Sequence, residues 1–370
     1  MTSPITIKTP GKLMVAGEFA VLEPYHQLIV MAVDRFLYTT IKDNKMNEVH
    51  IKDFKLYNQR FHFDGKRVNF EKEGPAIRFV KDALTITLTY LKEKKIYPKP
   101  FSLTIKSELD DQETGQKYGL GSSAAVVTSV VTAVLTKFLP ETPSKELIFK
   151  LASISHIKTQ GNGSGADIAA STYGGILLFS SFQAEWLLTE IENANSVKEI
   201  VEKDWTYLSI RSLKFPTQVQ LVVGWTGKPA STKSLVSEIR EMKKDNRNKY
   251  YEAFLKESKR AVLRIVEGME NDDAKMFTTG IEQNRKALSE VGKRADVEIE
   301  TEKLYTLSKE ANKLGGVGKL SGAGGGDCGI AFLPMDKDVA PLEEAWQKNG
   351  IKPLKMNVHP YGSEPTFIKH

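Results

Sequence analysis

The pattern of hydrophobic and polar positions predicts strands and helices that mix along the whole chain. Short stretches rich in β-branched and aromatic residues predict strands at 5–8, 13–22, 28–40, 101–105, 174–179, 219–225, 328–333 and 351–358. Apolar residues at a helical period predict helices at 77–94, 124–139, 144–158, 167–172, 234–269, 273–291, 300–314 and 342–349. Because both kinds of element occur in both halves, we predict an α+β fold.

The length of 370 residues suggests two domains. The stretch 183–213 is charged and has no clear period, so we place the boundary there. This gives an N-terminal domain at 1–185, a connecting segment at 186–216 and a C-terminal domain at 217–370. Near the start of the chain, Pro10-Gly11 predicts a turn between two strands.

The net charge of +6, from 52 Lys and Arg against 46 Asp and Glu, does not by itself identify a partner. The densest basic stretch, 240–249, is interrupted by acidic residues, which is typical of a solvated helix face rather than a nucleic-acid-binding surface. The apolar stretch 124–139 is short for a membrane span and favours a buried helix. A single cysteine, Cys328, cannot form an internal disulfide, and the first residues lack the apolar core of a signal peptide. We therefore expect a cytoplasmic protein without nucleic-acid or membrane partners.

One glycine-rich segment combines the features of a phosphate site. Its glycines let the backbone approach a ligand, and an apolar helix follows whose free N–H groups and positive dipole end favour anions. The candidate phosphate-binding residues are Gly119, Leu120, Gly121, Ser122, Ser123 and Ala124. Lys117 could reach a phosphate, and a serine hydroxyl could bind Mg²⁺. A tight turn capped by a serine explains the segment equally well.

Two well-known nucleotide motifs do not describe this segment. A P-loop requires Ser or Thr after Gly-Lys, but Gly318-Lys319 is followed by Leu320. The spacing from Gly119 loosely fits a dinucleotide-binding fingerprint. However, a polar loop rather than a strand precedes it, and Glu141 lies between two prolines rather than at a strand end. We therefore do not favour a Rossmann fold.

Two further glycine-rich segments carry candidate polar residues. The segment 319–329 suits close approach to an anion, with a hinge or tight turn as the alternative, and Asp327 in it could cap the turn. The segment 160–171 places Asp167 on the first turn of a helix, where it could face a substrate or act as a dipole partner. Lys12 would be its partner, although in isolation it is a typical surface lysine.

Three segments of the chain, in order, resemble the motifs of the GHMP kinases, a superfamily of small-molecule kinases. The first motif is similar to 10–22, the second to 119–126 and the third to 319–331, so the likeness spans nearly the whole chain. It implies an N-terminal domain like domain 2 of ribosomal protein S5 and a C-terminal ferredoxin-like domain. The active site would lie in the cleft between them.

Within this superfamily, the chain is most similar to the branch that phosphorylates phosphomevalonate. The similarity lies in 156–169, in 224–233 and in the Gly-Gly-Gly-Asp-Cys-Gly ending of the third motif. Mevalonate kinases carry a metal-binding glutamate eleven residues before the aspartate, where this chain has His156. The resemblance implies ATP-dependent formation of diphosphomevalonate in isoprenoid biosynthesis. Mevalonate kinase or another GHMP kinase is the alternative, and a non-catalytic sensor of the same fold is disfavoured because Lys12 and Asp167 are intact.

The resemblance also implies roles for individual residues. Lys12, Asp167 and Lys117 are the candidate catalytic residues, and Mg²⁺ would accompany ATP near Ser122 or Ser123. His156 is expected to pack near the site rather than to catalyse. The candidate substrate-binding residues are Lys12, Gly163, Ser164, Ser231, Thr232, Ser321, Gly322, Ala323 and Gly324. Capping of the helix that starts near Ser234 explains Ser231 and Thr232 equally well. We identify no obligatory protein partner.

Overall fold

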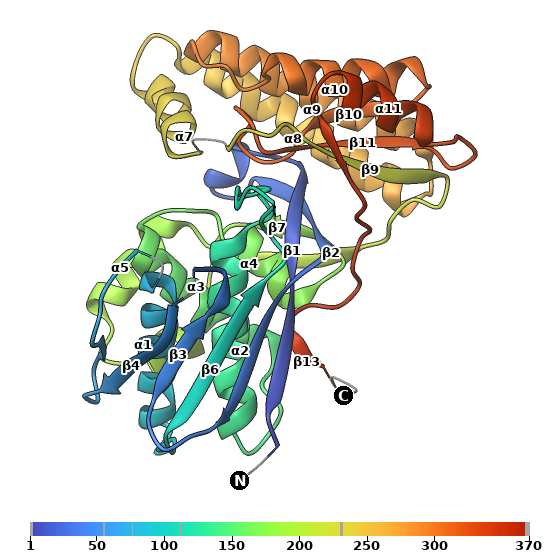
Figure 1. The fold of residues 1–370 in the computed structure, drawn as a ribbon. Helices are drawn as coiled ribbons and strands as arrows, with labels where there is room; N and C mark the ends of the chain where they lie inside the picture. The colour runs from blue at the N-terminus through green and yellow to red at the C-terminus, as the bar shows by residue number, and fades with distance from the viewer. Residues whose placement is uncertain (1–2, 55, 76, 112, 230–231, 367–370) are drawn as a thin grey trace.

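Two sheets organise the molecule, a large one built mainly from the first half of the chain and a small one from the second half (Figure 1). The computed structural model describes residues 3–54, 56–75, 77–111, 113–229 and 232–366. The large sheet has the order β13-β1-β2-β6-β3-β4-β5, with β7 paired to β2 and β8 paired to β7. Its strands are β1 (Ile5–Ala16), β2 (Gln27–Asp43), β3 (Glu48–Ile51), β4 (Leu56–Phe63), β5 (Val68–Phe70), β6 (Phe101–Ser107), β7 (Ile176–Ser180), β8 (Ser209–Leu213) and β13 (Glu364–Thr366). The small sheet has the order β10-β11-β9-β12, from β9 (Val219–Trp225), β10 (Val317–Leu320), β11 (Cys328–Pro334) and β12 (Lys352–Leu354).

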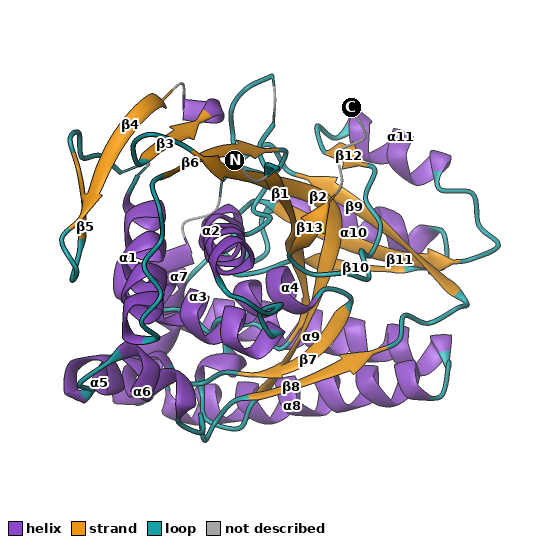
Figure 2. Ribbon diagram, turned by 90° about the horizontal axis from the view of Figure 1, so that it is seen from below, coloured by secondary structure: helices purple, strands orange, loops and turns teal. Residues whose placement is uncertain are grey.

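Helices from the first half of the chain pack on the large sheet (Figure 2). They are α1 (Arg78–Glu93), α2 (Ser122–Phe138), α3 (Lys145–Gln160) and α4 (Ala166–Tyr173), with α5 (Ala184–Asn193) and α6 (Val197–Glu202) beside them. The short turns η1 (Ala20–Leu22) and η2 (Lys52–Phe54) lie between strands. Helix α2 contacts β1, β2, α1, α3 and α4, which is why its sequence is apolar or small on every side. Its N-terminus is thereby fixed in the core.

The second half of the chain contains further helices and one short 3-10 turn. They are α7 (Thr232–Glu241), η3 (Met242–Lys244), α8 (Asn248–Glu270), α9 (Ala274–Ala295), α10 (Glu302–Lys313) and α11 (Ala340–Lys348). Helices α8 and α9 approach closely because of Gly268 and Gly280. A Cβ at Gly280 would lie 2.6 Å from Ile265 Cγ1. No helix in the described ranges combines the length and apolar character needed to cross a membrane.

Three local expectations from the sequence were wrong. Pro10 and Gly11 do not form a turn, because β1 runs through them with a bulge in its pairing to β2. The single helix expected at 234–269 is interrupted between α7 and α8, where the Asp245 carboxylate accepts a hydrogen bond from Arg247 N at 2.7 Å. The stretch 183–213 is not irregular, because it contains α5, α6 and β8.

The two sheets correspond to the two domains that we propose for the chain, with the boundary in 186–216. Strand β8 within that segment pairs with β7, so it extends the large sheet before the chain enters the small one. The end of the chain then returns to the large sheet, because β13 pairs with β1. The proposed C-terminal domain therefore has its last described strand in the N-terminal sheet.

This returning C-terminal segment, residues 356–366, is anchored by close contacts along the large sheet (Figure 1). The Ser363 hydroxyl lies 2.7 Å from Thr9 Oγ1 and 2.9 Å from Thr132 Oγ1, all buried. Ser363 N donates to Ser171 O at 2.7 Å. At Gly362 the backbone passes so close to α4 that an added Cβ would lie 2.0 Å from Thr172 O.

We expect Gly362→Ala to destabilise the fold, because the new methyl group must push the C-terminal segment away from α4. The expected loss is about 1–3 kcal/mol of unfolding free energy. Thermal and urea unfolding measure it. Gly74→Ala is the matched control, since a Cβ at Gly74 meets nothing within 4 Å. Equal unfolding midpoints for the two variants would contradict the tight packing described for this segment.

Candidate active site

The glycine-rich segment 119–121 leads directly into the N-terminus of α2. Gly119 and Gly121 have φ values of +83° and +78°, which residues with side chains rarely adopt. Gly121 is the N-cap of α2, and no side chain caps this helix end. The N–H groups of the first turn are therefore available to an anion, at the positive end of the helix dipole.

Lys12 is held against this segment by the bulge in β1. Its backbone N donates to Leu120 O at 2.9 Å, and its ammonium Nζ donates to Gly119 O at 3.0 Å. The residue is 8% exposed, so it is not the surface lysine that it would be in isolation. Gly11 permits the approach, because a Cβ there would lie 3.1 Å from Leu120 O.

Asp167 comes to the same point from α4. Gly165, with a φ of +82°, is the N-cap of this helix, and Asp167 Oδ1 accepts from Ile168 N at 3.0 Å. A Cβ at Gly121 would lie 3.0 Å from Lys12 Cγ and 3.4 Å from Asp167 Cβ. The structure thus brings Lys12, Asp167 and the start of α2 together around Gly121.

Ser123, on the first turn of α2, is paired with a buried histidine. Its Oγ lies 3.2 Å from His156 Nε2. His156 is 3% exposed and stacks on Phe79, with ring centroids 5.3 Å apart. Burial lowers the pKa of His156 below its ordinary value, although the charge of Asp167 acts in the opposite direction. A neutral imidazole therefore fixes the Ser123 side chain, as expected for a histidine that packs near the site.

Asp327, a possible turn cap from the sequence, lies against Gly119. A Cβ at Gly119 would lie 2.5 Å from Asp327 Cγ, so this carboxylate occupies the space beside Gly119. The backbone of Asp327 has a φ of +54°. Its N–H donates to Lys228 O at 2.7 Å, and its carbonyl oxygen accepts from Thr226 N and from Thr226 Oγ1, each at 3.0 Å. The segment 319–329, the third glycine-rich segment along the chain, thus meets the segment 119–124 across the two domains.

A second contact between the domains surrounds Tyr118, the residue before Gly119. Tyr118 OH donates to Asp111 Oδ1 at 2.7 Å, and Lys352 Nζ of β12 donates to the same oxygen at 2.6 Å. These hydrogen bonds hold the pKa of Asp111 well below its usual range. Cys328 Sγ donates to Tyr118 O at 3.1 Å, and burial raises the pKa of this thiol. No sequence pattern indicates the ion pair between Asp111 and Lys352.

The remaining predicted residues lie in the three segments or beside them. Lys117 is exposed, and its backbone forms a bridge with Asp110 just before the phosphate segment. Ser164 Oγ accepts from Ala166 N at 3.3 Å, and Gly163 precedes it in the turn before α4. Helix α7 begins at Thr232. Ser231 and the Thr232 side chain lie outside the described residues.

In the third segment, Ser321 Oγ accepts from Met14 N of β1 at 2.8 Å. Gly322, Ala323 and Gly324 follow it, and a Cβ at Gly322 would meet nothing within 4 Å. A Cβ at Gly324, by contrast, would lie 2.2 Å from Ile299 O, so the two glycines differ in role. Gly322 has open space around it, whereas Gly324 allows close packing.

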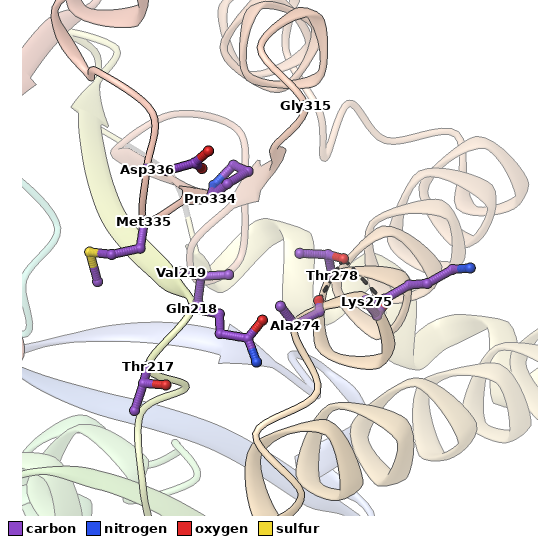
Figure 3. Close-up of a pocket in the computed structure, with 10 residues that line it drawn as sticks. All are labelled: Thr217, Gln218, Val219, Ala274, Lys275, Thr278, Gly315, Pro334, Met335 and Asp336. Atoms are coloured by element: carbon purple, nitrogen blue, oxygen red, sulfur yellow. Dashed lines mark hydrogen bonds between the residues drawn. The ribbon is translucent and has the colours of Figure 1, made fainter.

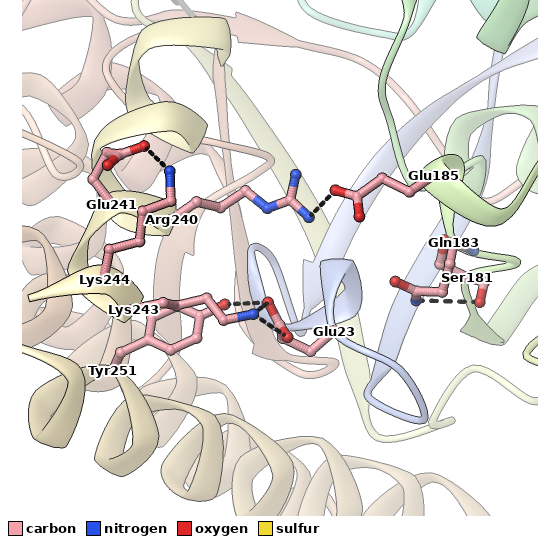
Figure 4. A network of polar contacts seen from close by, with 9 residues as sticks. All are labelled: Glu23, Ser181, Gln183, Glu185, Arg240, Glu241, Lys243, Lys244 and Tyr251. Carbon is pink, nitrogen blue, oxygen red and sulfur yellow. Dashed lines mark hydrogen bonds and ion pairs between the residues drawn. The ribbon is translucent and has the colours of Figure 1, made fainter. Parts of the chain in front are cut away.

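Polar contacts from α7, η3 and the start of α8 hold this part of the chain to the N-terminal domain (Figure 4). Glu23, which follows η1, accepts from Lys243 Nζ and from Tyr251 OH, each at 2.7 Å. Burial and Glu23 together raise the pKa of Tyr251 above its ordinary value. Arg240, at the end of α7, pairs with Glu185 of α5 at 3.3 Å.

Two surface hollows lie away from these residues. One, of about 560 Å³, is formed where β9 and α9 begin and β11 ends (Figure 3). The residues that line it are Thr217, Gln218, Val219, Ala274, Lys275, Thr278, Gly315, Pro334, Met335 and Asp336. Another, of about 360 Å³, lies along β4 and β5. Neither contains a predicted site residue, so we do not assign the active site to them.

Models of one protein family match two regions of the chain. Residues 78–175 match the family described as GHMP kinases N terminal domain, and residues 255–352 match GHMP kinases C terminal. A phosphomevalonate kinase from Streptomyces sp. (strain CL190) is 32% identical, over 94% of this chain and 95% of its own length.

Solved structures resemble the whole chain. A Lin0012 protein from Listeria innocua is 38% identical with a TM-score of 0.92, over 98% of this chain and 99% of its own. The phosphomevalonate kinase of Streptococcus pneumoniae, in complex with phosphomevalonate and AMPPNP, is 29% identical with a TM-score of 0.82, over 95% of this chain and 99% of its own. With both domain models matched and a relative above 30% identity along nearly its full length, the chain belongs to the GHMP kinases, in their phosphomevalonate kinase branch.

Proposed function

We propose that this enzyme transfers the γ-phosphoryl group of ATP to the phosphate of phosphomevalonate, giving diphosphomevalonate and ADP in the mevalonate route to isoprenoids. The observation that carries the proposal is the convergence at Gly121 of a buried lysine, a carboxylate and an uncapped helix N-terminus. The related Streptococcus pneumoniae enzyme binds phosphomevalonate and AMPPNP, which supports the same substrate pair here. We also propose that the enzyme is cytoplasmic, in keeping with its lone, unpaired cysteine.

The helix N-terminus would hold the phosphates of ATP. Backbone N–H groups from 119–124 can donate to phosphate oxygens, and the dipole of α2 favours their negative charge. Leu120 contributes only its backbone, since its side chain is 1% exposed. Lys117 precedes this segment, is exposed and has a flexible side chain, so it can add a positive charge from the solvent side.

Lys12 would offset the charge that accumulates between the two phosphates during transfer. Phosphoryl transfer between two polyanions depends mainly on positioning and on electrostatic stabilisation. The ammonium of Lys12 donates to a backbone carbonyl of the phosphate segment. It is therefore fixed close to where the transferred group would pass, and its low exposure strengthens its field.

Asp167 would orient the acceptor rather than remove a proton from it. A phosphate monoester has a second pKa of about 6, so its attacking oxygen is already deprotonated near neutral pH. The Asp167 carboxylate and the Lys12 ammonium form no ion pair in this structure, in which both residues are described, so each can interact with the substrates. Asp167 can then position Lys12 and Mg²⁺ once the phosphates are bound.

Mg²⁺ fits the residues present if phosphates and water provide most of its ligands. No group of three or more His, Cys, Asp or Glu side chains in the described ranges could hold a metal by itself. This agrees with the usual binding of Mg²⁺ through one or two protein groups plus substrate phosphates. Ser122 or Ser123 would hold the ion, which would neutralise charge on the phosphates of ATP.

The acceptor would contact the two other glycine-rich segments and the start of α7. Gly163 and Ser164 precede α4, and the hydroxyl of Ser164 can donate to a phosphate or carboxylate. In the third segment, Ser321 already accepts from Met14 N, so its O–H remains a donor. The backbone at Gly322, Ala323 and Gly324 can approach an anion closely, and Ser231 and Thr232 belong to the same proposed set.

We expect Lys12→Met to lower kcat by about 100- to 1,000-fold, because it removes a fixed positive charge from the path of the transferred group. Steady-state kinetics with saturating ATP and phosphomevalonate measure this effect, and circular dichroism checks the fold. Lys256→Met, at an exposed position of α8, is the matched control and should keep full activity. Near-normal turnover of a folded Lys12→Met variant would remove Lys12 from the site.

We expect the enzyme to phosphorylate phosphomevalonate and to leave mevalonate unchanged. The physical reason is that a neutral His156 stands where mevalonate kinases have a carboxylate, and the polar groups of the site suit an acceptor with a charged phosphate. A coupled ADP-release assay with mevalonate, phosphomevalonate, galactose and homoserine, followed by ³¹P NMR of the product, tests this. A preference for mevalonate would place the chain in the other branch.

A further inference from the structure

A fully buried ion pair joins the two domains beside the proposed active site. Glu18, just after β1, and Lys319 of β10 are 2% and 0% exposed, and their Oε1 and Nζ atoms are 2.5 Å apart. Lys319 Nζ also donates to Leu320 O at 2.5 Å. The pair therefore connects the end of the first motif with the backbone that begins the third.

Asn284 of α9 completes this cluster. Its Nδ2 donates to Glu18 Oε2 at 3.1 Å, and its Oδ1 accepts from Gly17 N at 3.1 Å. Asn284 is 1% exposed. Gly17 has a φ of +94°, and a Cβ there would lie 2.3 Å from Gln27 O, so the backbone has little freedom at this point. Both carboxylate oxygens of Glu18 are thus hydrogen-bonded.

The free-energy cost of burying this ion pair suggests that it has a role beyond stabilising the fold. Burying two charges is expensive, and apolar side chains of similar volume often stabilise a protein as well or better. Burial lowers the pKa of Lys319, and the charge of Glu18 opposes this effect. An arrangement that keeps an ammonium, a carboxylate and an amide in the core fixes positions more strictly than apolar packing does.

The residues that this cluster holds in place lie in the proposed active site. Met14, two residues beyond Lys12 in β1, donates its backbone N–H to Ser321 Oγ at 2.8 Å. Lys319 and Leu320 precede Ser321 directly. The hydrogen bond from Met14 N to Ser321 Oγ therefore attaches the third glycine-rich segment to β1, the strand that carries Lys12. A shift of Lys319 relative to Glu18 would change the distance between this segment and Lys12.

We propose that Glu18, Asn284 and Lys319 are positioning residues that set the third glycine-rich segment at the correct distance from Lys12, and so align the acceptor phosphate with the donor. This inference rests on the proposed function, because it assigns the third segment to the acceptor. The nucleotide phosphates, held by 119–124, do not depend on the cluster. Loss of the cluster therefore lowers kcat while nucleotide affinity stays close to that of the wild type.

An exchange of two side chains tests the proposal. Glu18→Gln removes the carboxylate that pairs with Lys319, and Asn284→Asp places a second carboxylate against Glu18. Each should lower kcat by about 10- to 100-fold, since a displacement near 1 Å has this effect on catalysis. The paired variant Glu18→Gln/Asn284→Asp again contains one carboxylate, one amide and one ammonium, and should recover at least a third of wild-type kcat.

Three further measurements separate positioning from simple stability. Calorimetric titration with AMPPNP should give a Kd within about threefold of wild type for every variant. Hydrogen exchange at the Met14 amide should speed up in the single variants and slow again in the paired one. Glu257→Gln is the matched control, because it breaks an exposed pair with Arg260 on α8 and should leave kcat and exchange unchanged.

The proposal is overturned if the folded single variants retain kcat within about twofold of wild type, or if the paired variant is no faster than the single ones. A paired variant that fails to fold overturns it too, because the cluster should tolerate the exchange. If the single variants do not fold, the kcat of the paired variant tests the proposal by itself: a value of at least a third of wild type supports it, and a lower value overturns it. Absence of phosphomevalonate kinase activity in the wild-type protein would refute the proposed function instead. In that case, hydrogen exchange at the Met14 amide still shows whether the cluster holds β1 against the third glycine-rich segment.

Discussion

The free N-terminus of α2 is the feature on which the rest of the site depends. This helix is buried on nearly every side by β1, β2, α1, α3 and α4, so its first turn cannot shift to find other partners. Gly119 and Gly121 adopt left-handed backbone conformations that leave its N–H groups uncapped by side chains. Lys12 and Asp167 then add one charge of each sign beside Gly121. The protein core thus pre-organises the site that we propose for phosphate oxygens.

The C-terminal domain completes the proposed site through a few single contacts from one short segment. Asp327 lies against Gly119, Cys328 donates to Tyr118 O, and Ser321 accepts from Met14 N. All three residues belong to the third glycine-rich segment or its edge, so one short stretch of the C-terminal domain contacts both other motifs. The returning C-terminal segment adds a covalent constraint, because the chain that leaves the small sheet pairs again with the large one through β13. Both features favour a fixed relation between the domains.

The sequence predicts those parts of the structure that have a local cause. Glycines followed by an apolar helix predict the glycine turn that opens α2, and Asp167 follows a glycine turn at a helix start, as the structure has it. The bulge at Pro10 was mistaken for a turn because the same residues suit both, and only pairing with β2 distinguishes them. The pair of Asp111 with Lys352 joins residues 241 positions apart, and the contact of Asp327 with Gly119 also depends on how the domains pack. No local pattern encodes such contacts.

A crystal structure of the enzyme with a non-hydrolysable ATP analogue and phosphomevalonate is the most direct test of the account. We expect the β- and γ-phosphate oxygens within hydrogen-bonding distance of backbone N–H groups in 119–124. We also expect the Lys12 ammonium between the γ-phosphate and the acceptor phosphate. A triphosphate bound away from the start of α2, for example in the hollow between β9 and α9, would contradict the central claim.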